Sequence, residues 1–151
     1  MPAKPTRIAV RAVIVHEARL LLVNAWPKGR GALLCAPGGG AEPGSSLPQN
    51  LSREVHEETG LAITVGLPCL INEFHDPRSG FHQIDIFFRC ALTGSAVISP
   101  DWEDPEQVVS ERYWVTLDEM RALKVKPDAL ADVAFNPDVA LRYDPLERIV
   151  T

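Results

Sequence analysis

The sequence predicts an α/β (α+β) fold in which helices pack on the faces of a mixed β-sheet. Two observations favour this class. Runs of β-branched and aliphatic residues come first in the chain, and stretches with helical periodicity are inserted among them and appended after them. Such an order suits a sheet that is covered by helices. A chain of 151 residues without repeats or linker-like segments also indicates a single domain over residues 1–151.

The predicted strands begin with a hairpin. Residues 8–15 and 19–24 are rich in aliphatic residues and are separated by the short turn His16-Glu17-Ala18. A short strand at 32–36 runs into the loop Pro37-Gly38-Gly39-Gly40. Further strands are expected at 63–74, 81–92 and 112–115, and a turn-rich segment joins the first two of these.

Three helices are predicted from periodicity and capping signals. Residues 46–59 have helical periodicity, Ser46 and Gln49 have the spacing of a capping box, and Gly60 stands where a helix C-cap is expected. Thr116 opens a second helix, to about residue 123, with the same box spacing. A third helix is expected after Pro127.

The composition excludes several classes of protein. With 46% hydrophobic and 23% charged residues the chain is globular, and its net charge of −5 argues against general nucleic-acid binding, which needs a basic surface. No apolar run is long enough to span a bilayer or to act as a signal peptide, so we expect a cytoplasmic protein without membrane partners. Cys35, Cys69 and Cys90 lack metal-site spacing and are interpreted as reduced, buried thiols.

One side of the 46–59 helix combines carboxylates with the apolar stripe. At about 100° per residue, Glu58 lies about 40° and Leu51 about 60° from Glu54, and Glu57 lies about 60° away on the other side. Clustered carboxylates at a packing face repel one another and lose hydration. A hard divalent cation, Mg²⁺ or Mn²⁺, removes both costs because it prefers oxygen ligands. The alternative is an exposed acidic patch, as in most charge runs.

The segment PGGGAEPGSSLPQNLSREVHEETGL, from Pro37 to Leu61, resembles the Nudix box, G-x5-E-x7-R-E-U-x-E-E-x-G-U, in which U is an aliphatic residue. The specified positions that match are Gly39, Arg53, Glu54, Val55, Glu57, Glu58, Gly60 and Leu61. Ser45 stands where the pattern has its first Glu. The layout of the chain resembles this family over about residues 7–124, with 125–151 as a C-terminal helix and tail.

Similarity to the Nudix (MutT-like) hydrolase family implies an α/β/α sandwich with a mixed sheet and a loop-helix-loop catalytic motif. It also implies a metal-dependent pyrophosphohydrolase, in which water attacks a phosphoanhydride of a nucleoside-diphosphate-linked substrate such as a nucleotide, a nucleotide sugar or an ADP-ribose-like molecule. Glu54, Glu57 and Glu58 would bind Mg²⁺ or Mn²⁺, and Arg53 belongs to the same catalytic set.

Substrate contacts are less narrowly defined. The amides of Gly38, Gly39 and Gly40 can approach phosphate oxygens closely, and Arg30 is a further candidate for a phosphate contact. Trp26 is a candidate for stacking on a base, or else a packing residue, and Trp102 is open to the same two interpretations. Pro77 lies 16 residues beyond Leu61, a spacing that resembles a marker of ADP-ribose-cleaving members, although a proline in a turn needs no special reason.

Several alternatives stay open. The general base is expected first among the box carboxylates, and other candidates are Asp101, Glu103, Asp104 and Glu106. Ser45 motivates the alternative of a non-catalytic nucleotide-binding or regulatory module, and the acidic helix also suits the solvated face of an unrelated α/β domain. The tail from Asn136 to Thr151 either folds back on the domain or packs on a second subunit as a homodimer.

Overall fold

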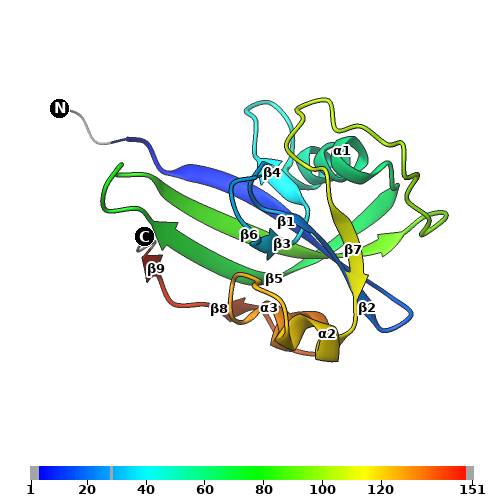
Figure 1. The fold of residues 1–151 in the computed structure, drawn as a ribbon. Coiled ribbons are helices and arrows are strands. Elements are labelled where there is room, and N and C mark those ends of the chain that lie inside the picture. Colours follow the sequence, from blue (N-terminus) through cyan, green and yellow to red (C-terminus); the bar gives the residue numbers. More distant parts are fainter. Residues whose placement is uncertain (1–3, 28, 149–151) are drawn as a thin grey trace.

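The computed structural model describes residues 4–27 and 29–148. In Figure 1 a curved sheet forms the centre of the molecule, with α1 (Leu47–Thr59) on one face and α2 (Leu117–Arg121) and α3 (Leu130–Ala134) on the other. The predicted sandwich of helices around a mixed sheet is confirmed. The strands are β1 (Arg7–His16), β2 (Arg19–Asn24), β3 (Leu34–Cys35), β4 (Gly38–Gly40), β5 (Ile63–His75), β6 (His82–Leu92), β7 (Arg112–Val115), β8 (Arg142–Tyr143) and β9 (Glu147–Arg148).

The sheet is built around β1. One edge of β1 pairs in parallel with β6 along almost its whole length. The other edge pairs antiparallel with β4 near its start and with β2 near its end, which confirms the predicted hairpin. The strand order is β3-β2-β1-β6-β5-β8, with β4, β7 and β9 paired to β1, β2 and β5. Parallel and antiparallel neighbours therefore occur in one sheet, as predicted.

Alternate residues of β1 face opposite sides of the sheet, as the pleat requires. Val10, Ala12 and Ile14 belong to the core cluster that buries the apolar stripe of α1. Val13 belongs to a second cluster, which contains Leu130 of α3. Burial of the stripe fixes how α1 is rotated on the sheet, and with it the place of the glutamates that border the stripe.

Two short elements differ from the prediction. The three glycines of β4, predicted as a loop, form a strand because they pair with β1, a contact between distant segments that local propensity does not reveal. Helix α2 ends at Arg121 rather than near residue 123. The chain after it joins β3: the Leu34 N–H donates to the Lys124 carbonyl at 2.9 Å and the Lys126 N–H to the Leu34 carbonyl at 3.3 Å. Because residues 124 and 126 pair with β3, this segment does not continue α2.

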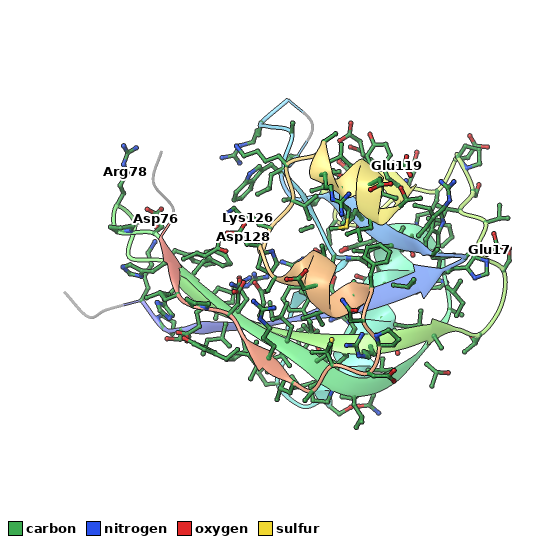
Figure 2. All side chains as sticks on the ribbon, turned by 90° about the horizontal axis from the view of Figure 1, so that it is seen from below. Glu17, Asp76, Arg78, Glu119, Lys126 and Asp128 are labelled. Atoms are coloured by element: carbon green, nitrogen blue, oxygen red, sulfur yellow. The ribbon has the colours of Figure 1, made fainter. Side chains whose placement is uncertain are left out.

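The tail folds back on the domain in its described part, the first of the two predicted arrangements. Strands β8 and β9 pair in parallel with β5. Figure 2 shows Lys126 and Asp128 close together, and Lys126 Nζ lies 2.9 Å from Asp128 Oδ1 and 3.7 Å from Glu147 Oε2 of β9. Residues 149–151 lie outside the described part. Over the segments that are described, no helix is long and apolar enough to cross a membrane.

Candidate active site

Helix α1 begins and ends at its predicted capping residues. The Ser46 hydroxyl accepts a hydrogen bond from the Gln49 N–H at 3.2 Å, and the Gln49 side chain accepts one from the Ser46 N–H at 3.0 Å. Gly60 adopts the left-handed conformation, with φ of 77°, and its N–H donates to the His56 carbonyl. Because both ends are fixed, the height of each glutamate along the helix is fixed as well.

The glycines of β4 make room for carboxylates of α1. A Cβ at Gly39 would lie 2.7 Å from the carboxylate carbon of Glu54. The Gly38 N–H donates to both carboxylate oxygens of Glu58, at 3.1 and 3.3 Å. The Gly38 amide, predicted to meet a phosphate, is therefore engaged by Glu58, and phosphate contacts from Gly39 and Gly40 stay predictions.

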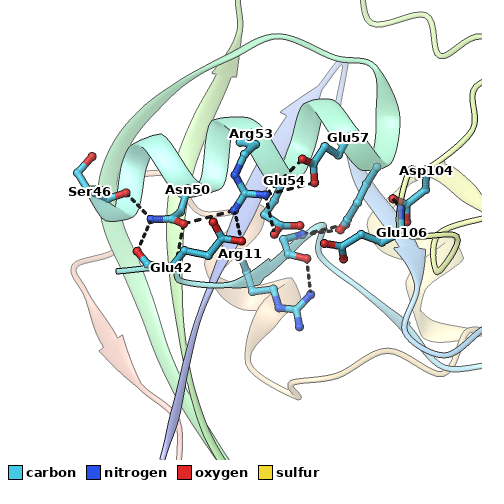
Figure 3. Close-up of polar contacts among 11 residues, drawn as sticks. Arg11, Glu42, Ser46, Asn50, Arg53, Glu54, Glu57, Asp104 and Glu106 are labelled. Atoms are coloured by element: carbon cyan, nitrogen blue, oxygen red, sulfur yellow. Dashed lines mark hydrogen bonds and ion pairs between the residues drawn. The ribbon is translucent and has the colours of Figure 1, made fainter. Parts of the chain in front are cut away.

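Carboxylates from α1 and from a distant loop converge beside the helix (Figure 3). One oxygen each of Glu54, Glu57 and Glu106 lies within 4.8 Å of the other two. In residues 4–27 and 29–148 this is the one such group that could hold a metal ion, and we call it the acidic group. Glu54 is buried, Glu57 half-buried and Glu106 exposed, so the group opens from the core to solvent. Of the three predicted ligands it contains two, with Glu106 in place of Glu58.

Hydrogen bonds to Asp104 stabilise the loop that places Glu106 beside α1. The buried Asp104 carboxylate accepts hydrogen bonds from the N–H groups of Glu106, Val108 and Val109, at 3.0, 3.1 and 2.9 Å. A carboxylate with three backbone donors is held in one orientation. These bonds support a structural role for Asp104, which was one of the candidates for the general base.

The C-terminal end of α1 is closed by two further side chains. Trp102 Nε1 donates to the Glu57 carbonyl at 2.8 Å, and Arg112 Nε donates to the Glu58 carbonyl at 2.7 Å. The Trp102 ring also covers Gly60, where a Cβ would lie 2.9 Å from it. Packing, rather than base stacking, is therefore the role that these contacts support for Trp102. The two bonds satisfy carbonyls that a helix end leaves free.

Burial disfavours the ionised forms of Glu54 and Glu58. Desolvation raises the pKa of Glu58 to about 8, although the Arg11 guanidinium and the Gly38 N–H oppose the rise. Desolvation also raises the pKa of Glu54, and the charge of Glu106 adds to the effect. A divalent cation at this place would favour the ionised carboxylates.

Arg11 is a largely buried cation that the sequence interpretation missed. Its Nε lies 3.3 Å from Asp85 Oδ1, and its Nη1 donates to the carbonyls of Ala36 and Gly38, at 3.3 and 3.4 Å. A lone arginine inside an otherwise apolar predicted strand was the signal for it. The Cys35 thiol lies 3.9 Å from the same nitrogen. Desolvation nevertheless raises the pKa of Cys35 to about 11, which favours the protonated thiol at neutral pH and argues against a nucleophilic role.

The three cysteines are free thiols, as predicted, but they differ in burial. Cys69 is buried, whereas Cys35 and Cys90 are partly exposed, so the prediction of three buried thiols is correct for Cys69 alone. Cys69 packs in the core cluster on the α3 face of the sheet.

The remaining predicted contacts lie in loops. Trp26 is 41% exposed, and Arg30 is exposed in a turn that its N–H closes on the Pro27 carbonyl. Pro77 lies in a turn in which the Ser79 hydroxyl donates to Asp76 at 2.7 Å, so the turn itself explains a proline there. Trp26 and Arg30 are accessible to a ligand, and their roles stay predictions.

Comparison with known proteins identifies the family. A model of the NUDIX domain matches residues 5–136. The chain belongs to the NUDIX family. The resemblance carried by the Nudix box is confirmed, and the alternative of an unrelated α/β domain is excluded. Solved structures of NUDIX hydrolases share the fold described above.

Solved Nudix structures extend over nearly the whole chain. A NUDIX hydrolase from Nitrosomonas europaea has a TM-score of 0.74 at 26% identity and covers 92% of this chain and 93% of its own. An ADP-ribose pyrophosphatase from Streptococcus suis shares the fold, with a TM-score of 0.66 at 20% identity over 95% and 98% of the two chains. The mouse protein named nucleoside diphosphate-linked moiety X motif 6 is 31% identical over 85 residues, 56% of this chain. The match spans 25% of the length of that curated relative.

Proposed function

We propose that this Nudix protein hydrolyses a phosphoanhydride bond in a nucleoside-diphosphate-linked substrate and requires Mg²⁺ or Mn²⁺. The observation that carries the proposal is the convergence of Glu54, Glu57 and Glu106 beside α1. Without a cation the three negative carboxylates repel one another, and carboxylate oxygens are the ligands that hard divalent ions prefer. The family match and the hydrolase among the structural neighbours support the same chemistry.

The residues present fit a divalent cation. Glu54 and Glu57 from the helix and Glu106 from the loop would hold it, and three carboxylates leave positions for waters and phosphate oxygens. When bound, the cation would neutralise charge on the diphosphate and acidify the attacking water. Glu58 accepts the Gly38 N–H and retains further lone pairs, so it stays a proposed ligand for a water or a second cation.

Hydrolysis requires a group that takes a proton from water. The water oxygen forms a bond to phosphorus, the bridging P–O bond breaks, and two phosphate-bearing products leave. The proposed proton acceptors are Glu106 and the box carboxylates, of which Glu54 and Glu57 share the cation site with Glu106. Asp104 is a poorer candidate because its oxygens already accept three backbone N–H groups.

ADP-ribose is the first substrate to test. The neighbour from Streptococcus suis is named an ADP-ribose pyrophosphatase, although at 20% identity it shares the fold alone. In this chain the exposed Trp26 ring offers a surface for a base, and Arg30 offers a cation for a phosphate. Nucleotide sugars and nucleoside triphosphates complete the proposed class.

A panel of nucleotides tests the function. The wild type is assayed with Mg²⁺ and with Mn²⁺ for release of phosphate or a mononucleotide, beside Glu57→Gln and the control Glu17→Gln, whose side chain is 83% exposed in the β1–β2 turn. Metal-dependent turnover that is lost only in Glu57→Gln supports the proposal. Nucleotide binding without turnover in the wild type would favour the non-catalytic module instead.

A further inference from the structure

Arg53 stands between the acidic group and the loop before α1 (Figure 3). Its Nη1 lies 3.3 Å from both carboxylate oxygens of Glu57 and 3.4 Å from Glu54 Oε1. Its Nη2 lies 3.5 Å from Glu42 Oε1 and 3.4 Å from Asn50 Oδ1. The guanidinium is therefore shared between two carboxylates of the proposed metal site and one carboxylate outside it.

Asn50 fixes the loop that carries Glu42. Its side chain is buried, with 1% of the residue exposed. Oδ1 accepts the Glu42 N–H at 2.9 Å, and Nδ2 donates to the carbonyls of Ser46 and Ser45 at 2.8 and 3.2 Å. A buried amide with these partners has one orientation. The spacing between Glu42 and the helix is fixed as a result, and the Glu42 carboxylate stays beside Arg53.

Ser45 stands at the position where the Nudix box has a glutamate. We propose that Glu42 and Asn50 are positioning residues that bind Nη2 of Arg53, so that only Nη1 contacts the metal-binding carboxylates, and that they take the place of the glutamate missing at position 45. The inference rests on the proposed function, since it concerns the same cation site. It assigns the role to a residue three positions earlier in the chain.

Arg53 and a divalent cation compete for the same carboxylate oxygens. A guanidinium in full bidentate contact with a carboxylate forms bonds of about 2.7–2.9 Å. Arg53 has no such bidentate contact: Nη1 alone lies 3.3 Å from Glu57 and 3.4 Å from Glu54, and Nη2 lies 3.5 Å from Glu42. The Glu42 side chain is 66% exposed, and such an ion pair adds little to stability. The Glu42 ion pair therefore acts mainly by fixing the position of the Arg53 guanidinium.

Four variants test the role of Glu42: Glu42→Gln, Ser45→Glu, the two combined, and Glu17→Gln as a charge-matched control. Mn²⁺ affinity is measured by calorimetry, and thermal unfolding is followed without metal. For the best substrate of the panel, kcat and KM are determined. We expect Glu42→Gln to weaken Mn²⁺ binding and to lower kcat by about tenfold, the smaller effect typical of outer-shell partners of metal ligands. KM and Tm should not change.

Rescue separates positioning from general damage. Ser45 is exposed and precedes the helix cap, so a glutamate at this position of the Nudix box should be accommodated without disturbing the core. We expect the combined variant to recover Mn²⁺ affinity to within about twofold of the wild type. Asn50→Ala should lose both Mn²⁺ affinity and thermal stability, and added Ser45→Glu should restore the affinity alone, because the buried hydrogen bonds stay broken.

Two results would overturn the proposal. The first is an unchanged Mn²⁺ affinity in Glu42→Gln, or a loss that Ser45→Glu does not repair. The second is an equal loss in Glu17→Gln, because net charge would then be the cause. If the wild type and the variants follow the expected Mn²⁺ pattern but hydrolyse no nucleotide, the positioning role stands and the proposed hydrolase function fails.

Discussion

The Glu54 carboxylate fills the space that a side chain at Gly39 would occupy, with 2.7 Å between its carbon and the position of a Cβ. The glycine strand β4 and the glutamates of α1 therefore depend on each other. We expect Gly39→Ala to displace Glu54 from the acidic group and to weaken Mn²⁺ binding about tenfold or more. Gly94→Ala is the control, since a Cβ there meets nothing within 4 Å. Equal Mn²⁺ affinities in the two variants would contradict the expectation.

The loop that delivers Glu106 should depend on Asp104. Asp104→Ala leaves three backbone N–H groups without their acceptor, and an unsatisfied buried donor costs about 1–3 kcal/mol. We expect the free energy of unfolding to fall by about 2 kcal/mol and Mn²⁺ affinity to fall with it. Urea denaturation and calorimetry check the two effects. A variant with wild-type stability would show that the loop is held in another way.

Glu58 should make the metal-free protein less stable as the pH rises. Its pKa is about 8 in the folded protein against an ordinary value of 4.5. Between these values the folded state keeps a proton that the unfolded chain has lost, so the contribution is fully present below pH 4.5 and is lost as the pH rises to about 8. One such proton corresponds to at most about 1.4 kcal/mol per pH unit.

Thermal unfolding in a chelator across this window checks the pH dependence. Glu58→Gln cannot ionise, so its Tm should fall less with pH than that of the wild type. The same variant separates this group from others that titrate nearby, such as Glu54, whose pKa is also raised. An equally steep fall in Glu58→Gln and the wild type would assign the effect to another residue.

Arg11 should stabilise the sheet beside the active site. Arg11→Met leaves Asp85 without its ion pair, whose atoms lie 3.3 Å apart. Breaking a fully buried pair costs about 3–5 kcal/mol, and we expect about 2 kcal/mol here because the Arg11 side chain is 19% exposed. Urea denaturation measures the change. Adding Asp85→Leu removes the unpaired charge and should recover part of the lost free energy of unfolding. A further decrease would show that the cost of Arg11→Met does not come from leaving the Asp85 charge unpaired.

The helix and its ends could be predicted from the sequence because the signals are local. Ser46 and Gln49 form the expected capping box, Gly60 adopts the expected conformation, and the hairpin of β1 and β2 follows from two aliphatic runs around a turn. Glu54 and Glu57 were recognised because their spacing on one helix already determines that they lie close together.

The partners of these glutamates depend on contacts between distant segments. Glu106 joins them only because Asp104 folds a loop that has no periodic pattern. Glu42 approaches Arg53 because the buried Asn50 holds its backbone, whereas the box pattern directs attention to Ser45. Neither arrangement has a signature in a short stretch of sequence.

The most direct test of the proposed site compares Mg²⁺-dependent hydrolysis in the wild type, Glu57→Gln, Glu106→Gln and Glu17→Gln. We expect kcat to fall about 100-fold in Glu57→Gln and in Glu106→Gln, and to stay within about twofold of the wild type in Glu17→Gln. Wild-type turnover in Glu106→Gln would contradict the assignment of the loop carboxylate. Wild-type turnover in Glu57→Gln would contradict the site as a whole.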